Sequence, residues 1–147
     1  MATTETTIDV PRERVFGVLA RPEAYADWVV GSDLIRDADA SWPATGSRFH
    51  HRVGFGPFKV KDHTEVIEVQ PPGKLVMHAR ARPLGTALVT VLLEAQGDST
   101  RVTMHETAGD ALSRLAINPL TDWLVHHRNV ESLRRLKRIA ETGVLEP

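Results

Sequence analysis

Three polar side chains have the types and positions that acid–base chemistry would need: His51, Asp62 and Glu106. Each stands in a run of alternating residues that predicts a β-strand, and the alternation places each on the same face as its apolar neighbours. A histidine beside a carboxylate can act as a general base that the carboxylate orients, because imidazole titrates near neutral pH. A carboxyl group inside an apolar sheet has a raised pKa if it is unpaired, so Glu106 could act as an acid or donate a hydrogen bond to a ligand carbonyl.

The pairing of His51 with Asp62 depends on two local features of the chain. A turn at residues 54–57 would join their strands and make the two side chains diagonal neighbours, and a bulge near Val66 is needed to keep Asp62 on the inner face. The same pattern fits a polar pair in a cavity wall that performs no chemistry. Glu106 could equally lie in water at the open end of the sheet, so both interpretations stay open.

Most of the other inward positions are apolar or aromatic, and we expect them to line a ligand cavity. The candidate ligand-contacting residues are Tyr25, Trp28, Phe49, His51, Thr64, Met77, Val89, Val91, Met104, Glu106, Leu120, Trp123 and His127. An apolar lining with a few convergent polar groups is typical of small-molecule sites. Any one of the aromatic residues alone would equally serve as core.

Seven histidines raise the question of a metal site, especially the pairs His50–His51 and His126–His127. Adjacent residues point to opposite faces of a strand and lie about 100° apart on a helix, so neither pair can chelate one ion. The sequence has no cysteine and no HExxH motif. We therefore predict neither a metal nor another cofactor.

The elements that must position these residues follow from hydrophobic periodicity. A β-branched run at residues 3–9 predicts a strand, Pro11 then opens a helix, and a second short helix is expected at residues 23–29. Between residues 32 and 107, short alternating runs separated by proline and glycine predict six further strands joined by tight turns. Tight turns join neighbouring strands in an antiparallel sheet.

After Gly109 the hydrophobic period returns to 3.6 residues and predicts a long helix. Pro119 should kink or break it, which leaves a continuous part from Leu120 to about Glu141. The apolar stripe expected on this helix consists of Leu112, Leu115, Leu120, Trp123, Val130, Leu133, Leu136 and Ala140. A twisted sheet curls, and a helix of about 30 Å can lie in its concave face. The sequence therefore predicts an α+β fold in which a curved, seven-stranded antiparallel sheet surrounds a long C-terminal helix.

The composition excludes several classes of protein. The chain of 147 residues has the length of one domain, which we place at residues 1–147, and its 18 basic and 19 acidic residues give a net charge of -1. This balance provides no field to collect a phosphate backbone, so we expect no nucleic acid partner. The absence of cysteine demands no oxidising compartment, and no apolar run approaches the length of a membrane helix. We expect a cytoplasmic monomer or homodimer with neither a signal peptide nor stable membrane insertion.

Four segments of the chain resemble a known family. They are residues 7–16 (TIDVPRERVF), 22–28 (PEAYADW), 66–76 (VIEVQPPGKLV) and 132–137 (SLRRLK), the last followed by Glu141. In this order and spacing they resemble the polyketide cyclase/dehydrase branch of the START-like, or SRPBCC, superfamily. The resemblance spans nearly the whole chain and implies the helix-grip fold. It also implies that Tyr25 and Trp28 belong to the segment that covers the mouth of the cavity.

The resemblance implies a single START-like domain that binds a small hydrophobic or aromatic molecule, lipid-like or polyketide-like, in an internal cavity. Because the superfamily also contains enzymes, a second hypothesis is a polyketide cyclase or dehydratase that uses His51, Asp62 or Glu106 as acid–base groups. A third is a protein-interaction module, as in co-chaperone relatives of this fold, which an exposed apolar patch would favour. The first two hypotheses require a cavity inside the sheet, whereas the third requires a partner protein and no deep cavity.

Overall fold

The computed structural model describes residues 2–55, 57–82, 85–110 and 119–143. Its helices and strands, in chain order, are β1 (Ala2–Ile8), α1 (Arg12–Leu19), the 3-10 helix η1 (Pro22–Ala24), α2 (Tyr25–Trp28), β2 (Ser32–Ala38), β3 (Arg48–Phe55), β4 (Phe58–Gln70), β5 (Lys74–Ala81), β6 (Gly85–Gln96), β7 (Ser99–Ala108) and α4 (Pro119–Thr142). The seven strands form one antiparallel sheet in the order β1-β7-β6-β5-β4-β3-β2. The predicted α+β fold, with seven strands, short helices after the first strand and a long C-terminal helix, is confirmed.

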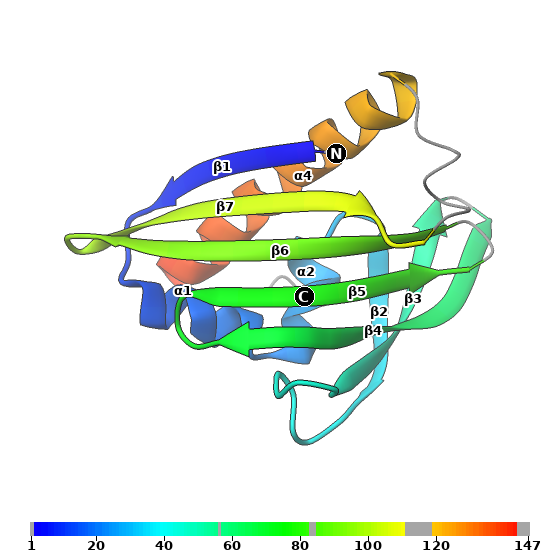
Figure 1. Ribbon diagram of the computed structural model, residues 1–147, viewed down its shortest axis with the longest axis horizontal. Coiled ribbons are helices and arrows are strands. Elements are labelled where there is room, and N and C mark those ends of the chain that lie inside the picture. The colour runs from blue at the N-terminus through cyan, green and yellow to red at the C-terminus, as the bar shows by residue number, and fades with distance from the viewer. Residues whose placement is uncertain (1, 56, 83–84, 111–118, 144–147) are drawn as a thin grey trace.

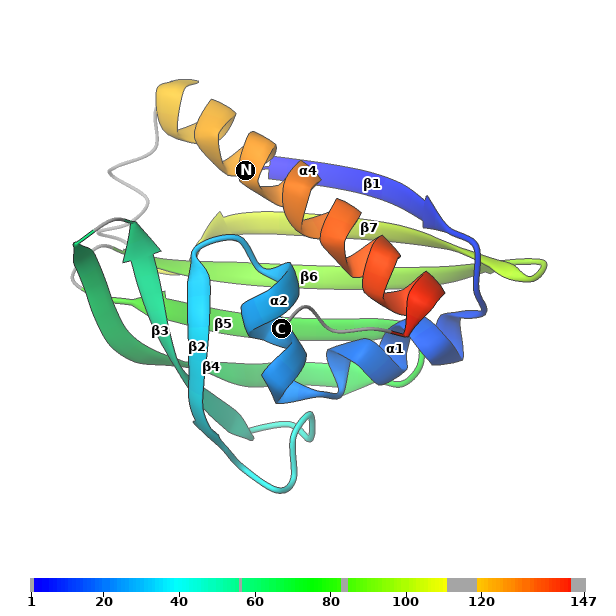
Figure 2. The same ribbon diagram turned by 180° about the vertical axis from the view of Figure 1, so that it is seen from behind.

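The sheet curves around the helices, which lie on its concave side. Figure 1 shows the sheet in front of α1, α2 and α4, and Figure 2 shows from behind that α4 crosses the sheet diagonally. The C-terminal end of α4 lies beside α1, whereas its N-terminal turns extend beyond the sheet in both views. The two halves of α4 therefore have different surroundings.

Local turns and one bulge set the register of the strands. Gln96 pairs with Ser99, and the two residues between them include Gly97, whose φ of 62° lies in the left-handed region that favours glycine. In the pairing of β4 with β5 the register shifts between Val66 and Glu68, which confirms the predicted bulge near Val66. Upstream of this bulge, the alternation of β4 places Asp62 and Thr64 on the inner face, where both are buried.

The two edge strands of the sheet differ in their regularity. The pairing of β2 with β3 is interrupted twice, between Ser32 and Leu34 and between Ile35 and Asp37. At the opposite edge β1 pairs with β7 without interruption. The Nζ atom of Lys137 on α4 donates a hydrogen bond of 2.6 Å to the carbonyl oxygen of Thr7 on β1. Helix and edge strand are therefore joined directly at this point.

The long helix is confirmed from Pro119 to Thr142, close to the expected range. Proline suits the first position of a helix because its missing N–H would have no partner there. Leu133, Leu136 and Ala140 are buried as predicted, whereas Leu120, Trp123 and Val130 are exposed, which corrects the predicted stripe. Each step of three residues rotates about 60° backwards around a helix, so a stripe built from such steps winds off the buried face. The two remaining stripe residues, Leu112 and Leu115, lie outside the described residues.

The buried face of α4 combines apolar and small polar residues. Its members are Asn129, Ser132, Leu133, Leu136, Ile139 and Ala140. Spacings of three, four and seven residues place these side chains on one side of the helix. Among the described residues, no helix has the length and apolar character needed to cross a membrane.

Candidate ligand-binding site

Cross-strand register arranges the inner-face side chains in rows across the sheet. One row joins Leu75 of β5, Val91 of β6 and Met104 of β7, and all three are at most 3% exposed. They belong to the same buried cluster as Leu133 and Leu136 of α4. Interiors of this kind reach the packing density of organic crystals. This end of the concave face is therefore filled by the protein's own side chains.

Toward the other end of the sheet, the side chains in the inner rows become small. Ala79 of β5, Ala87 of β6 and Ala108 of β7 are register partners in one row, and Ala81 pairs with Gly85 in the next. All five are only partly buried, although they lie on the concave side. Methyl groups extend a short distance from the backbone, so this part of the face stands lower than the rows of valine, leucine and methionine. We call Ala79, Ala87 and Ala108 the alanine platform; all three are partly exposed.

Other predicted site residues border the alanine platform. Thr64 of β4 is the register partner of both Ala79 and Phe49, and Met77 pairs with Val89 in the neighbouring row. Thr64, Phe49 and Met77 are buried, and Val89 is partly buried. The structure thus brings these four predicted ligand-contacting residues to one region of the inner face.

His51 lies on the inner face of β3 with its ring enclosed. The residue is 3% exposed, and neither Nδ1 nor Nε2 has a hydrogen-bond partner among the described residues. Burial lowers the pKa of His51 to about 4, although the charge of Asp62 opposes this shift. The imidazole is therefore neutral at physiological pH and offers one donor and one acceptor.

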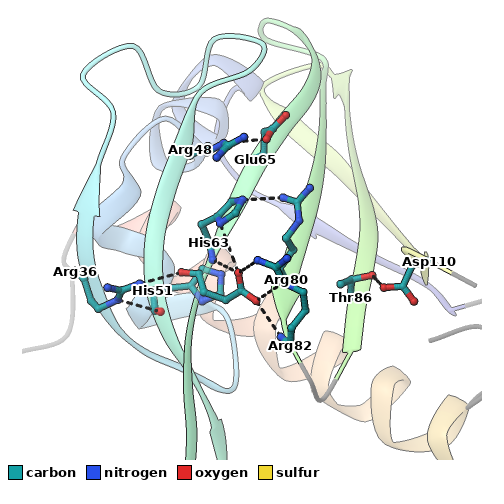
Figure 3. Close-up of polar contacts among 10 residues, drawn as sticks. Arg36, Arg48, His51, His63, Glu65, Arg80, Arg82, Thr86 and Asp110 are labelled. Atoms are coloured by element: carbon teal, nitrogen blue, oxygen red, sulfur yellow. Dashed lines mark hydrogen bonds and ion pairs between the residues drawn. The ribbon is translucent and has the colours of Figure 1, made fainter. Parts of the chain in front are cut away.

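Asp62 is the direct register partner of His51, not its diagonal neighbour, and it does not bind the imidazole. Its carboxylate accepts bonds from the backbone N of Arg82 at 2.9 Å, and from the same residue's Nε at 3.1 Å and Nη2 at 3.0 Å (Figure 3). It also accepts from the backbone N of His63 at 2.9 Å. Burial alone would raise the pKa of Asp62, but the bonds and charge of Arg82 hold this pKa well below its usual range. The expected His51–Asp62 pair is therefore not formed, because Arg82 occupies the carboxylate.

Glu106 on β7 is ion-paired with Arg128 of α4. The side chain of Glu106 is 11% exposed and that of Arg128 is 32% exposed, so the pair lies at the border of the interior. Glu106 is therefore not the unpaired inner carboxyl group on which its acid role depended. The sequence places Glu106 on the correct face, but strand alternation contains no information about a partner on a helix.

An aromatic cluster connects α2 with the inner face of β3. The ring centroid of Tyr25 lies 5.2 Å from that of Trp28 and 4.7 Å from that of Phe49, and Phe49 lies 5.5 Å from His51. Tyr25 donates its hydroxyl proton to the carbonyl of Leu19 at 2.7 Å, so its polar group is already used. The indole Nε1 of Trp28 has no partner among the described residues. Three of the four predicted aromatic residues thus form one series of ring contacts that ends at His51, whereas Trp123 lies elsewhere.

Asn129 of α4 is a buried polar residue that the sequence analysis did not predict. It is 2% exposed, and its Nδ2 atom has no hydrogen-bond partner within the described part of the chain. One turn later, Ser132 accepts a bond of 3.1 Å from the backbone N of Val30, which ties this face of α4 to the end of α2. The signal was its spacing of four and seven residues before Leu133 and Leu136, which a search for apolar residues alone passes over.

Three predicted ligand-contacting residues lie away from this region. Leu120 is 65% exposed, Trp123 is 56% exposed, and His127 is also exposed. The rings of Trp123 and His127 lie 4.3 Å apart between centroids, so they cover each other on the surface of α4. These residues form an exposed strip, together with Leu124, instead of lining the inner face.

The outer face of the sheet carries a separate set of polar contacts. His50 points away from His51, as predicted, and its ring lies 5.8 Å from that of His63. Arg80 bonds to the Nε2 atom of His63 at 3.0 Å (Figure 3). Over residues 2–55, 57–82, 85–110 and 119–143, no three histidine, aspartate or glutamate side chains gather to hold a metal ion.

A surface groove of about 390 Å³ lies beside β2, outside the space between the sheet and α4. Its lining includes Pro22, Glu23, Ile35, Asp37, Asp39 and Trp42. Asp37 accepts a bond from the backbone N of Ala38, and Asp39 accepts one from that of Arg48. Both carboxylates accept hydrogen bonds from nearby backbone groups. The lining of the groove contains none of the inner-face residues described above, so the groove is separate from the candidate site.

The chain has measurable similarity to known proteins. The model of the family described as activator of Hsp90 ATPase homolog 1-like protein matches residues 9–141. No curated protein matches the chain in sequence. Solved structures with the same fold include NE0264 from Nitrosomonas europaea, at 17% identity over 97% of this chain and 94% of that chain, with a TM-score of 0.71. TTHA0849 from Thermus thermophilus has 15% identity over 97% of each chain and a TM-score of 0.70. BH1534 from Bacillus halodurans has 21% identity over 95% of each chain and a TM-score of 0.68.

Proposed function

The chain belongs to the family of activator of Hsp90 ATPase homolog 1-like proteins, and we propose that it binds a small, mostly apolar molecule between the concave face of its sheet and α4. The START-like superfamily predicted from the sequence is confirmed, whereas its polyketide cyclase branch is not. The observation that carries the proposal is the alanine platform, where Ala79, Ala87 and Ala108 are partly exposed on the inner side of the sheet. The row of Leu75, Val91 and Met104 on the same side is buried.

The chemistry around the alanine platform supports an apolar ligand. Val89 borders it and is partly exposed, and covering apolar surface contributes about 25 cal/mol for each Å² removed from water. The two acidic groups of this region are already paired, Asp62 with Arg82 and Glu106 with Arg128. Affinity would thus come from apolar contacts, and a few neutral polar groups would orient the molecule.

Native mass spectrometry with a matched pair of variants tests this proposal. Ala87 lies on the platform, and Leu88, the next residue, lies on the outer face with 37% exposure. The wild-type protein and Leu88→Ala should retain a small molecule after gentle purification, or after incubation with lipid and aromatic polyketide mixtures. Ala87→Leu should lose it, because the added atoms occupy the platform.

Thermal unfolding of each variant shows whether the protein is folded before binding is compared. Equal retention by Ala87→Leu and the wild type would place the ligand elsewhere. An apo mass for the wild type under every condition would reject the proposal.

The acid–base hypothesis now depends on His51 alone, because both candidate carboxylates have cationic partners. A neutral imidazole with a lowered pKa is a weak general base at neutral pH. If a substrate for cyclisation or dehydration is found, His51→Ala should abolish turnover while binding persists. Unchanged turnover would remove His51 from the catalytic assignment.

A protein-interaction module is the second candidate function, and the exposed strip favours it. Leu120, Trp123 and Leu124 are between 52% and 65% exposed on the N-terminal half of α4. Large apolar side chains gathered on a surface often mark a contact site. The family description suggests an ATPase of the Hsp90 type as the partner to try. Acceleration of its ATP hydrolysis by the wild type, but not by Leu124→Ser, would support this function, and an unchanged rate would argue against it.

A further inference from the structure

The outer face of β3, β4 and β5 carries a concentration of positive charge. Within the described residues of these strands, alternation places five lysine or arginine side chains and one carboxylate there, Glu65. We call the five cations the basic face; they are Arg48, Arg52, Lys59, Lys61 and Arg80. The whole chain has a net charge of -1, so the positive charge is gathered on one part of the surface.

The carboxylates nearest to the basic face already have partners. Glu65 accepts a bond of 2.9 Å from the Nε atom of Arg48. Asp62 lies on the opposite side of β4 and is bound by Arg82. Asp110, at the border of the region, accepts a bond of 2.6 Å from the hydroxyl group of Thr86.

Two members of the basic face have no carboxylate partner within the described part of the chain. Lys61 is exposed, and its side chain makes no ion pair or hydrogen bond there. Arg80 donates a bond of 3.0 Å to the Nε2 atom of His63, which is a neutral acceptor (Figure 3). The charges of Lys61 and Arg80 are therefore available to an anion from outside the protein.

The surroundings of these two residues confirm that the local potential is positive. Arg52 is the direct register partner of Lys61, and like charges directly opposite each other destabilise a sheet. Burial lowers the pKa of His63, and the charges of Arg80 and Arg48 lower this pKa further. An anion bound on this face would offset the repulsion between the cations.

The shape of the basic face favours a partner that brings surface of its own. The helices cover the concave side of the sheet, so this outer side is convex (Figures 1 and 2). Small molecules are bound mainly in clefts, where walls of the protein surround them. A convex face has no such walls, and a small anion would gain only a few exposed ion pairs there.

The composition of the face favours a protein partner over a nucleic acid or a membrane. Its described residues include no exposed phenylalanine, tyrosine or tryptophan, the side chains on which unpaired bases stack. Glu94, on the outer face of β6, is exposed and would be repelled by a bilayer of anionic lipid.

An extended acidic segment matches the spacing of the cations. Lys59 and Lys61 are two positions apart on β4, a separation of about 7 Å, and neighbouring strands lie about 5 Å apart. In an extended peptide, the side chains on one side repeat at the same interval of about 7 Å. Carboxylates at alternate positions of such a segment can therefore meet successive cations of the sheet.

We propose that the basic face binds an extended acidic segment of a partner protein, whose carboxylates are held by Lys61 and Arg80. This surface lies on the side of the sheet opposite to α4. The inference therefore depends neither on a molecule bound against the concave face nor on the exposed strip of α4.

Fluorescence anisotropy with short labelled probes tests this inference. The probes are an octapeptide of alternating glutamate and glycine, the same peptide with glutamine in place of glutamate, and a thymidylate oligonucleotide with the same number of negative charges. At low salt the glutamate peptide should bind about tenfold more tightly than the glutamine peptide, since several exposed ion pairs add up. This advantage should disappear at about 1 M salt, where charges are screened within about 3 Å.

Two variants remove the available cations, and a third removes a paired one as the control. Lys61→Gln and Arg80→Gln should each weaken binding of the glutamate peptide by about twofold to fivefold. Arg101→Gln removes the same charge from the outer face of β7, where Arg101 is ion-paired with Glu5, and should leave the affinity unchanged. Lys61 is exposed, so its variant carries the test even if Arg80→Gln fails to fold.

Three results would overturn the inference. Equal affinities for the glutamate and glutamine peptides would show that the basic face recognises no acidic segment. An equal loss of affinity in Arg101→Gln would show that binding follows total charge and not this surface. Tighter binding of the oligonucleotide, or of phosphatidylserine vesicles in a flotation assay, would replace the protein segment by that class of partner.

Discussion

At the end of the concave face near the turn between β6 and β7, the inner rows consist of large side chains, whereas at the opposite end they consist of alanine. Leu75 and Val91 are fully buried at the first end, while Ala79 and Ala87 are partly accessible at the second. One sheet with one curvature therefore provides both a packed core and a partly exposed surface of small side chains. The sizes of the side chains, not the course of the backbone, make this difference.

The long helix shows the same division along its length. Leu133, Leu136 and Ile139 are at most 1% exposed, whereas Leu120, Trp123 and Leu124 are more than half exposed. The C-terminal half of α4 thus holds the helix to the sheet and contributes to stability. The N-terminal half contributes little burial, so its apolar residues are available for contacts outside the domain.

Removing a large side chain from the packed end should produce the largest loss of stability. Leu136 is fully buried in the cluster that joins α4 to the sheet. Leu136→Ala should lower the free energy of unfolding by about 2–5 kcal/mol, since it removes apolar contacts and leaves a cavity. Urea unfolding followed by circular dichroism measures this change. A loss below about 1 kcal/mol would mean that the two ends of the interior do not differ as described.

Lowering the pH should reduce the free energy of unfolding through protonation of His51. The ring has a pKa of 6.5 when exposed, and burial lowers the pKa of His51 to about 4 in the folded protein. Between these values the unfolded chain binds more protons, so the free energy of unfolding falls as the pH falls. The full shift corresponds to about 3 kcal/mol, lost progressively from about pH 6.5 to about pH 4. Chemical denaturation at a series of pH values measures it.

The variant His51→Phe isolates this contribution. Burial also lowers the pKa of His63 and of His78, so both rings add to the loss in the same direction. The difference between the wild type and His51→Phe should therefore change with pH even though both proteins lose stability. Parallel curves for the two proteins would show that His51 is not protected from protonation by folding.

Changing the exposed half of α4 should have the smallest effect on stability. Trp123 is 56% exposed and contacts His127 on the helix surface. Trp123→Ser should leave the free energy of unfolding within about 0.5 kcal/mol of the wild type. A loss comparable to that of Leu136→Ala would show that the N-terminal half of the helix is packed after all.

The fold could be predicted from the sequence because its signals are local. Proline and glycine between alternating runs marked the strands, and the bulge near Val66 followed from a change in the phase of alternation. The faces of His50 and His51 followed from the same alternation. Each of these features depends on residues close together in the chain.

The partners of the site residues could not be predicted, because they are distant in the chain and compete with one another. Asp62 binds Arg82, twenty positions away, and not its register partner His51. Glu106 binds Arg128 on a helix whose orientation the strand pattern does not contain. A polar side chain such as Asn129 can lie on a buried face and is missed when only apolar spacing is considered.

The two register breaks in β2 affect how the protein behaves at high concentration. A regular edge strand offers its free N–H and C=O groups to the edge of another molecule, which can lead to aggregation. The breaks at Ser32/Leu34 and Ile35/Asp37 distort this row of groups. At the other edge, Lys137 occupies the carbonyl of Thr7. Strand-to-strand pairing is thus disfavoured along β2, and at the β1 edge one of the outward carbonyl groups is already bound within the protein.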